Sequence, residues 1–210
     1  MRGPVTQTLP PEPEFGASLP APARSDAVLA FLALRRSASA VTLAAPAPSH
    51  AELAELLRLA ARVPDHGKLA PWRFIVLEGK AKTAFAATLE TLAADTPEPD
   101  KARGALAKLR CPPLAVVVVS RHIEGKIPEW EQRLSAGAVA MTLLNAAQAM
   151  GYGANWITDW YAFDPRVDAL LGLGEGEKIA GYVYLGTPAE PPLERVRADV
   201  PALTTWWTAE

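Results

Sequence analysis

The sequence predicts a single domain of the α/β or α+β class, on two observations. First, its 210 residues, 50% of them apolar, are enough to bury one sizeable core, and this length favours one domain over two. Second, segments with apolar residues at helical spacing alternate with short β-branched runs typical of strands. We place the domain at residues 25–210. Residues 1–24 hold six of the 20 prolines, which predicts an extended or disordered arm.

Two helices are expected at the start of the domain. Ser25 can cap a helix through residues 26–36. Ser49 and Glu52 form a capping box, and apolar residues then recur at helical spacing until Pro64 stops the pattern. These are the clearest helix starts in the chain.

The middle of the chain predicts two strands and two helices. We expect a strand at residues 72–79, a helix at 80–94 and a short basic helix at 100–110. Residues 112–120, PPLAVVVVS, are apolar on both alternations, as in a strand that is covered on both faces. This strand should therefore lie centrally in the sheet.

A long helix is expected at residues 129–150, so rich in Ala, Leu and Met that nearly its whole circumference must be buried, in a core or at a subunit interface. Asp164 and Pro165 open a further helix, and residues 178–188 predict a strand.

The tail at residues 191–210 is too rich in proline for a helix. Its Trp206 and Trp207 are costly to leave in water. We therefore expect the tail to dock against the core of its own chain or against a partner chain.

Charge and hydropathy exclude several classes of partner. The 21 basic and 23 acidic residues give a net charge of -2, so no overall field favours nucleic acid or an anionic membrane. The apolar stretch at residues 27–34 is far shorter than the roughly 20 residues of a membrane span. The arginines follow this stretch, whereas a signal peptide carries its charge before it. We expect a cytoplasmic protein with a small-molecule site.

Several kinds of chemistry have no matching motif. Cys111 is the only cysteine, which excludes an internal disulfide and a multi-thiolate metal site, and we interpret it as a packing residue because two prolines and an apolar run follow it. The three histidines are far apart, so we expect no metal site. Neither phosphate-binding glycine loop nor a GxSxG turn is present. A hydrolase using Asp65 and His66 remains a minor alternative.

Two clusters can do more than pack. Arg35, Arg36 and Ser37 follow a helix, where guanidinium groups and a hydroxyl could grip a phosphate, or where the arginines could simply complement the helix dipole. The loop VPDHGKLAPW, with Arg62 just before it, contains His66 between two prolines. This loop is either a plain helix stop with a solvated histidine or a shaped binding loop.

Four ordered blocks of the sequence resemble one family. They are RRSAS, LLRLAARVPDHGKLAPWRFIVLEG, KIPEWEQRLSAGAVAMTLLNAAQAMGYGANWITD and KIAGYVYLGTP, and the likeness spans about residues 27–190. The chain is similar to the FMN-dependent nitroreductase family, in particular its small single-domain NAD(P)H nitroreductases. The resemblance implies an α+β, three-layer α/β/α fold with a mixed central sheet flanked by helices, in a homodimer.

The resemblance also implies a function. FMN would be held noncovalently at the dimer interface, NADH or NADPH would be the electron donor, and a small nitroaromatic or quinone would be the acceptor, in ping-pong order. No catalytic side chain is implied, because the flavin carries the chemistry. A flavin-binding store or redox-linked regulator without turnover is the alternative.

Site residues are implied in the same way. Arg35, Arg36 and Ser37 would contact the phosphate and ribityl side of FMN. The full cofactor-binding set is Arg35, Arg36, Ser37, Arg62, His66, Trp156, Ile157, Thr158, Gly186 and Thr187. Family members often carry an arginine and a serine at the positions of Ile157 and Thr158. That departure removes a charge near the cofactor and leaves the nicotinamide preference open.

Overall fold

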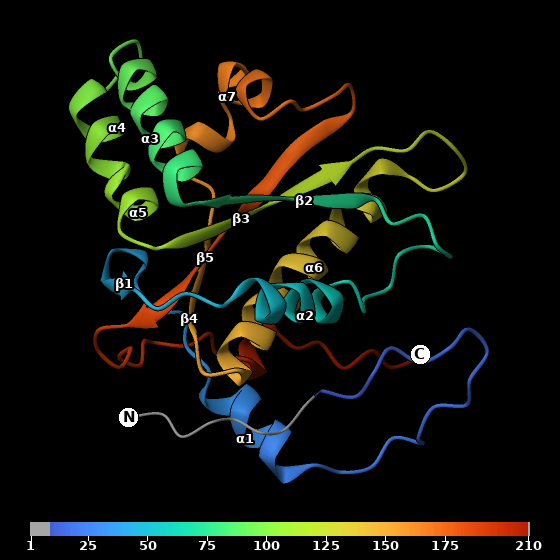
Figure 1. Cartoon of the computed structure of the whole chain (residues 1–210). Helices are drawn as coiled ribbons and strands as arrows, with labels where there is room; N and C mark the ends of the chain where they lie inside the picture. Colours follow the sequence, from blue (N-terminus) through green and yellow to red (C-terminus); the bar gives the residue numbers. More distant parts are fainter. Residues whose placement is uncertain (1–8, 210) are drawn as a thin grey trace.

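A five-stranded sheet lies between two layers of helices in the computed structural model, which describes residues 9–209 (Figure 1). The strands are β1 (Leu43–Ala44), β2 (Trp72–Glu78), β3 (Leu114–Arg121), β4 (Gly153–Ile157) and β5 (Glu177–Pro188). The α-helices are α1 (Asp26–Leu34), α2 (His50–Ala60), α3 (Gly79–Ala93), α4 (Pro99–Ala105), α5 (Ala107–Arg110), α6 (Glu129–Ala149) and α7 (Pro165–Leu170). The 3-10 turns are η1 (Ala40–Thr42), η2 (Trp160–Ala162) and η3 (Pro201–Leu203). The α+β class with three layers is confirmed.

The long strand β5 organises the sheet. The strand order is β1-β5-β3-β2, and β4 also pairs with β5, so β5 has three neighbours. The resemblance implied a mixed sheet, but every pairing among the described residues is antiparallel. The reason is visible between β2 and β3. Glu78, at the end of β2, is paired with Leu114, at the start of β3, so the helical connection returns the chain to the same end of the sheet.

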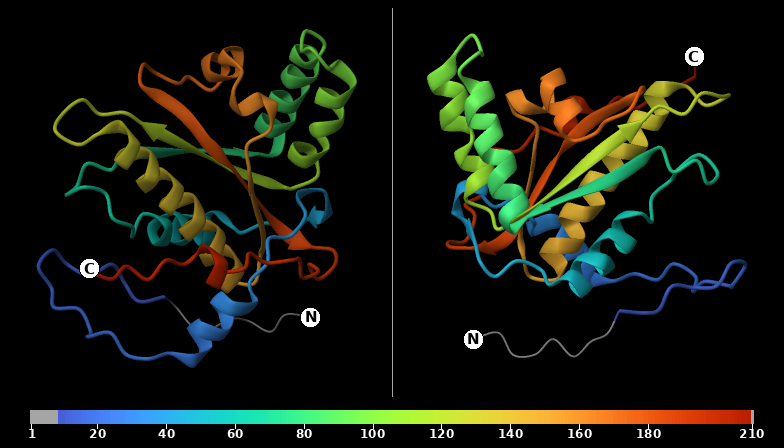
Figure 2. Two further views of the ribbon diagram at one scale, coloured as in Figure 1. Left: turned by 180° about the vertical axis from the view of Figure 1, so that it is seen from behind. Right: turned by 45° about the horizontal axis from the view of Figure 1, so that its top comes forward.

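Both faces of β3 are covered, as its sequence predicted. Val117 and Val119 pack with Leu89 of α3 on one face. Val116 and Val118 pack with residues of α2 and α6 on the other. Figure 2 shows α3, α5 and α7 on one side of the sheet and α2 and α6 on the opposite side. The central position of this strand is confirmed.

The helix starts that depend on local capping are also confirmed. Ser25 caps α1, and Ser49 and Glu52 form the capping box of α2. Asp164 caps α7. The basic helix expected at residues 100–110 is instead divided at Leu106 into α4 and α5, and β4 was not predicted at all.

The burial of α6 differs from the prediction. Its buried residues form a stripe that faces the sheet and α2, including Val139, Leu143 and Ala147. On the outer side, Trp130 is 63% exposed and Leu134 is 57% exposed. The expectation of burial around nearly the whole helix is therefore wrong within one chain. Its second part, a subunit interface, stays a prediction.

The tail and Cys111 also differ from their predictions. The tail contains only the short turn η3, as its prolines predicted, but Trp206 is 88% exposed and Trp207 is 84% exposed. Docking of these rings on their own core is therefore wrong, and docking on a partner stays a prediction. Cys111 is exposed, so the packing interpretation is wrong as well.

The N-terminal arm lies partly outside the described residues, which begin at residue 9. Residues 9–24 contain no helix or strand and are exposed. The domain boundary at residue 25 stays a prediction. Among residues 9–209, no helix combines the length and hydropathy needed to cross a bilayer.

Candidate functional site

The arginine cluster opens onto a small cavity at the C-terminal end of α6. The chain leaves α1 at Arg35 in an extended conformation, and Arg35 and Arg36 line a cavity of about 190 Å³ together with Gln148 and Tyr152. We call this cavity the arginine pocket. The buried Nε of Arg35 has no hydrogen-bond partner among the described residues, whereas the backbone oxygen of Arg36 accepts from Gln148. The Nε–H of Arg35 is therefore a buried donor for which residues 9–209 provide no acceptor.

The tail reaches the same pocket. Arg36 Nε donates to the backbone oxygen of Leu193 at 2.8 Å, and the Glu194 carboxylate lies 3.8 Å from the same nitrogen. Pro192 lines the cavity. The first residues of the tail are thus bound at the arginines, although its tryptophans are not.

The predicted strand-end residues lie close to the arginine pocket. Gly186 is paired with Gly153, another lining residue, and Thr187 Oγ1 donates to the backbone oxygen of Pro46 at 2.9 Å. A Cβ at Gly186 would lie 2.8 Å from the backbone oxygen of Ala44, so no side chain fits there. The structure therefore brings Gly186 and Thr187 to the same end of the sheet as the arginines.

The side chains of Trp156 and Ile157 are partly buried. Trp156 Nε1 donates to the backbone oxygen of Ala180 at 3.2 Å, and a Cβ at Gly181 would lie only 2.2 Å from that nitrogen. Trp156 packs against the core cluster of α2 and α6, whereas Ile157 packs against the cluster on the opposite face. Trp156 also lines a cavity of about 530 Å³ together with Gly137 and Ala180, so its side chain is accessible to a ligand there.

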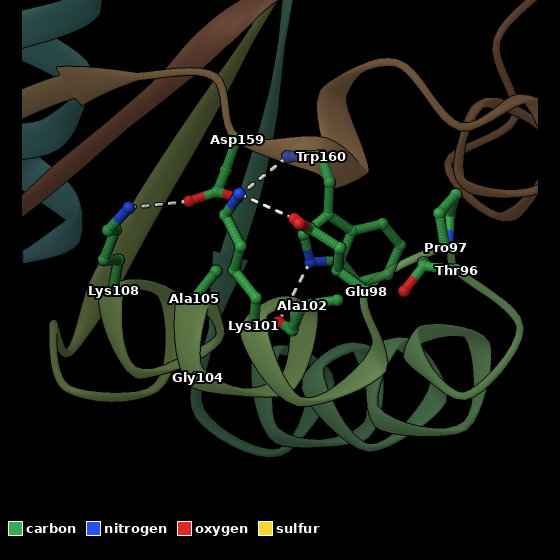
Figure 3. Close-up of a pocket in the computed structure, with 10 residues that line it drawn as sticks. All are labelled: Thr96, Pro97, Glu98, Lys101, Ala102, Gly104, Ala105, Lys108, Asp159 and Trp160. Carbon is green, nitrogen blue, oxygen red and sulfur yellow. Dashed lines mark hydrogen bonds and ion pairs between the residues drawn. The ribbon is translucent and has the colours of Figure 1, made fainter.

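A larger cavity lies where β4 ends (Figure 3). It has a volume of about 550 Å³ and is lined by residues of α4 and α5 and by Asp159 and Trp160, which follow Thr158 directly. We call it the β4-end pocket. Lys108 Nζ lies 2.8 Å from Asp159 Oδ2, and Trp160 Nε1 donates to the backbone oxygen of Ala102 at 3.0 Å. This pocket was not predicted from the sequence, although Lys101 and Lys108 belong to the basic segment at 100–110.

One segment joins the two pockets. The backbone N–H of Ala38 donates to the oxygen of Ala154 at 3.0 Å, which holds this segment beside β4. The chain then forms η1, which contacts α5, the helix that carries Lys108. Residues 35–42 therefore run from the arginine pocket to α5, which lines the β4-end pocket.

The His66 loop is held in a strained shape. His66, Gly67, Lys68 and Ala70 all have positive φ, with values of 59°, 76°, 76° and 45°. Left-handed conformations of residues other than glycine persist only where the surroundings impose them. This arrangement argues against a plain helix stop.

Contacts with α6 fix the loop. His66 Nε2 lies 3.1 Å from the backbone oxygen of Glu131, and its Nδ1 lies 3.5 Å from the Glu131 carboxylate. Ser135 Oγ donates to the backbone oxygen of Pro64 at 2.7 Å. These residues, with Trp130, line a cavity of about 370 Å³. Arg62 lies just beyond α2 and is exposed.

A single chain does not bring all the predicted residues together. His66 contacts Glu131, near the start of α6, whereas Arg36 contacts Gln148, near its end. At about 1.5 Å per residue, these two positions lie about 25 Å apart along the helix. Arg35, Arg36, Ser37, Gly186 and Thr187 therefore form one group, and His66 lies in another.

Two further titratable side chains, Tyr161 and Tyr184, meet in the core. The buried hydroxyls of Tyr161 and Tyr184 are 2.7 Å apart, and burial raises the pKa of both, so they stay protonated. Among the described residues, no group of three or more His, Cys, Asp or Glu side chains could hold a metal ion.

Known proteins similar to this chain share one family. The model of the "Nitroreductase family" matches residues 33–187. The Escherichia coli K12 protein named "Putative NAD(P)H nitroreductase YdjA" is 41% identical over 164 residues, which are 76% of this chain and 87% of that protein. A "Putative NAD(P)H nitroreductase" of Haemophilus influenzae is 34% identical over 169 residues, covering 77% of this chain and 89% of that one.

Solved structures agree in fold. A nitroreductase-like family protein from Bacillus cereus superposes with a TM-score of 0.76 at 21% identity, covering 89% of this chain and 99% of that one. A nitroreductase with bound FMN from Bacteroides fragilis has a TM-score of 0.67 at 20% identity, covering 88% of this chain and 100% of that one. The family match and the sequence identity together show that this chain belongs to the nitroreductase family of oxidoreductases.

Proposed function

We propose that this protein is an FMN-dependent oxidoreductase that takes electrons from NADH or NADPH and passes them, in ping-pong order, to a small acceptor such as a nitroaromatic or a quinone. The observation that carries the proposal is the buried Nε of Arg35, which has no hydrogen-bond partner within residues 9–209 and lies beside Arg36 in a member of this family. When bound, FMN supplies the redox chemistry by accepting a hydride and later giving up two electrons.

The cavity sizes support a cofactor that extends beyond the arginines. Sites for small molecules and cofactors usually measure about 300–1,000 Å³. The arginine pocket, at about 190 Å³, suits the phosphate end alone, whereas the β4-end pocket, at about 550 Å³, is large enough for a ring system. We place the ribityl chain along residues 37–42 and the flavin ring at the β4-end pocket.

Five of the predicted residues then have a role. Arg35 and Arg36 offset the negative charge of the phosphate, because guanidinium groups form charge-assisted hydrogen bonds to phosphate oxygens. Ser37 binds the FMN beside them. The backbone of Ile157 and Thr158 orients the ring, because their strand leads into the β4-end pocket. Lys108 also lines that pocket, where it is paired with Asp159.

A homodimer would complete the site. The outer face of α6 exposes Trp130 and Leu134, as an unpaired subunit interface would. If two copies of α6 cross near their midpoints in antiparallel directions, the start of one helix lies beside the end of the other. This symmetry would bring His66 of one subunit, with the nearby Arg62, close to Arg35 and Arg36 of the other, which a single chain keeps about 25 Å away. The aromatic tail could then cover the second subunit.

The test begins with the visible spectrum of the purified protein. We expect a yellow protein with flavin absorption, and bleaching when NADH or NADPH is added without oxygen. A yellow protein that neither donor bleaches would indicate a flavin store or regulator instead. A colourless protein that takes up no FMN when the cofactor is supplied would contradict the proposal.

A further inference from the structure

Asp159 has a backbone conformation that favours glycine. Its φ is 67° and its ψ is 174°, a region that side chains other than hydrogen rarely tolerate. The side chain is only 13% exposed. The fold therefore keeps a carboxylate at a position where glycine would be easier to accommodate, and strain of this kind points to a function.

The carboxylate of Asp159 makes two contacts in the wall of the β4-end pocket. Its Oδ1 accepts from the backbone N–H of Trp160 at 2.9 Å, which caps η2. Its Oδ2 lies 2.8 Å from Nζ of Lys108, and Figure 3 shows the two side chains pointing toward one another. The cap requires only an oxygen acceptor, whereas the ion pair requires the negative charge.

The ion pair cancels the positive charge of Lys108 inside the pocket. The second lysine that lines the pocket, Lys101, is also paired, with Glu98 at 2.6 Å. The pocket thus contains lysines but little net charge. A pocket built only to attract an anion would leave at least one of its lysines unpaired.

We infer that Asp159 sets the reduction potential of the flavin at this pocket and makes it a stronger reductant, by neutralising Lys108. This inference rests on the proposed FMN site. A hydride brings two electrons and one proton, so reduction adds one negative charge to the pocket. An unpaired Lys108 would stabilise that charge, and Asp159 removes this stabilisation. Electrons then pass more readily to an acceptor of low potential.

The experiment compares midpoint potentials of FMN-loaded wild type and Asp159→Asn by spectroelectrochemical titration. Asparagine keeps an oxygen to cap η2 and tolerates positive φ, but it lacks the charge. We expect the Asp159→Asn potential to shift to more positive values. Lys108→Gln should shift it to more negative values, and the double variant should return close to wild type.

Two further variants separate the effect of the Asp159 charge from a change in structure. Asp159→Gly removes the carboxylate at a backbone conformation that glycine adopts without strain, so the same positive shift should appear without a lower melting temperature. Glu55→Gln breaks a carboxylate–arginine pair with Arg58 on α2, outside the pocket, and should leave the potential unchanged.

The possible failures can be told apart. A wild-type protein that takes up no FMN contradicts the proposed function itself. If wild type binds FMN and both Asp159 variants keep its potential, the inference about Asp159 alone is wrong. Loss of FMN from Asp159→Asn, with the melting temperature unchanged, would also overturn it, because Asp159 would then be needed for binding rather than for tuning.

Discussion

The arginine pocket and the His66 loop are built in opposite ways. The arginine pocket forms from extended segments beside β4 and β5 and contains a donor without an acceptor. The His66 loop is irregular, holds four residues at positive φ and is pinned to the start of α6. The arginine pocket has an extended backbone but a buried donor that lacks an acceptor within residues 9–209. The His66 loop has its hydrogen bonds but a strained backbone. The difference supports the proposal that the first binds the phosphate of FMN and that the second faces a partner subunit.

The largest effect is expected at the arginine pocket. Arg35→Ala together with Arg36→Ala should lower FMN affinity by at least about 100-fold, because two charge-assisted contacts to the phosphate are lost. The affinity is measured by flavin fluorescence, and the melting temperature of the protein without FMN should change little. Arg58→Ala on α2 is the matched control. Wild-type FMN affinity in the double variant would contradict phosphate binding by Arg35 and Arg36.

Disrupting the outer face of α6 should have the next largest effect. Leu134→Asp places a charge on the proposed interface and should convert the dimer to a monomer with weakened FMN binding. Sedimentation velocity with and without FMN measures both changes. Leu170→Asp, at an exposed leucine on α7 in the other layer, should leave the dimer intact. A stable monomer that binds FMN tightly would contradict the proposed dimer site, because the His66 loop would then have no part in FMN binding.

An ion pair near the exit of the His66 loop predicts a pH effect. Arg73, at the second residue of β2, binds Glu177 of β5 at 2.7 Å, and this guanidinium is the main cause that holds the pKa of Glu177 at about 2. Because the folded pKa is depressed, the stabilisation is complete above the ordinary value of 4.5 and is lost as pH falls toward 2.

We expect the pair to contribute about 2 kcal/mol to the free energy of unfolding, after allowance for solvent screening. Denaturant unfolding at pH 7 and pH 3 should show a clearly smaller pH dependence in Glu177→Gln than in wild type. An identical pH dependence in the variant would show that other carboxylates dominate acid stability.

The smallest effect is expected within the strained loop. Lys68→Gly should raise the free energy of unfolding by about 1 kcal/mol, because glycine adopts the φ of 76° without strain. Lys68→Ala removes the same side chain but keeps the Cβ, so it should give no such gain. Equal stabilities of the two variants in urea titrations would show that the loop is not strained at this position.

Sequence reasoning succeeded where local chemistry decides the structure. The cap at Ser25, the capping box at Ser49 and the double-sided apolar run of β3 are all readable within a few residues. It missed β4, because the segment GANWI has no alternating pattern and becomes a strand through its pairing with β5. The helix at 100–110 was predicted, but not its division at Leu106.

The candidate site was predictable only in part. The sequence marked Arg35, Arg36 and Ser37 as a candidate phosphate site, and the structure places the two arginines in one pocket. Trp156, Ile157 and Thr158 came from the family resemblance alone. The backbone strain at Asp159 was not predicted, because no sequence pattern indicates that an aspartate has a positive φ. The distance between His66 and the arginines depends on the length and direction of α6, which a linear motif does not encode.

The position of β5 in the chain has a consequence for the synthesis of the protein. This strand pairs with β1, β3 and β4, yet it follows all of them in the chain. Until it leaves the ribosome, β3 has only β2 beside it, and its apolar residues lack the other half of the sheet. Long-range strand pairing of this kind is slow and leaves apolar surface open to aggregation. The five-stranded sheet therefore cannot form until residues 177–188 have been synthesised.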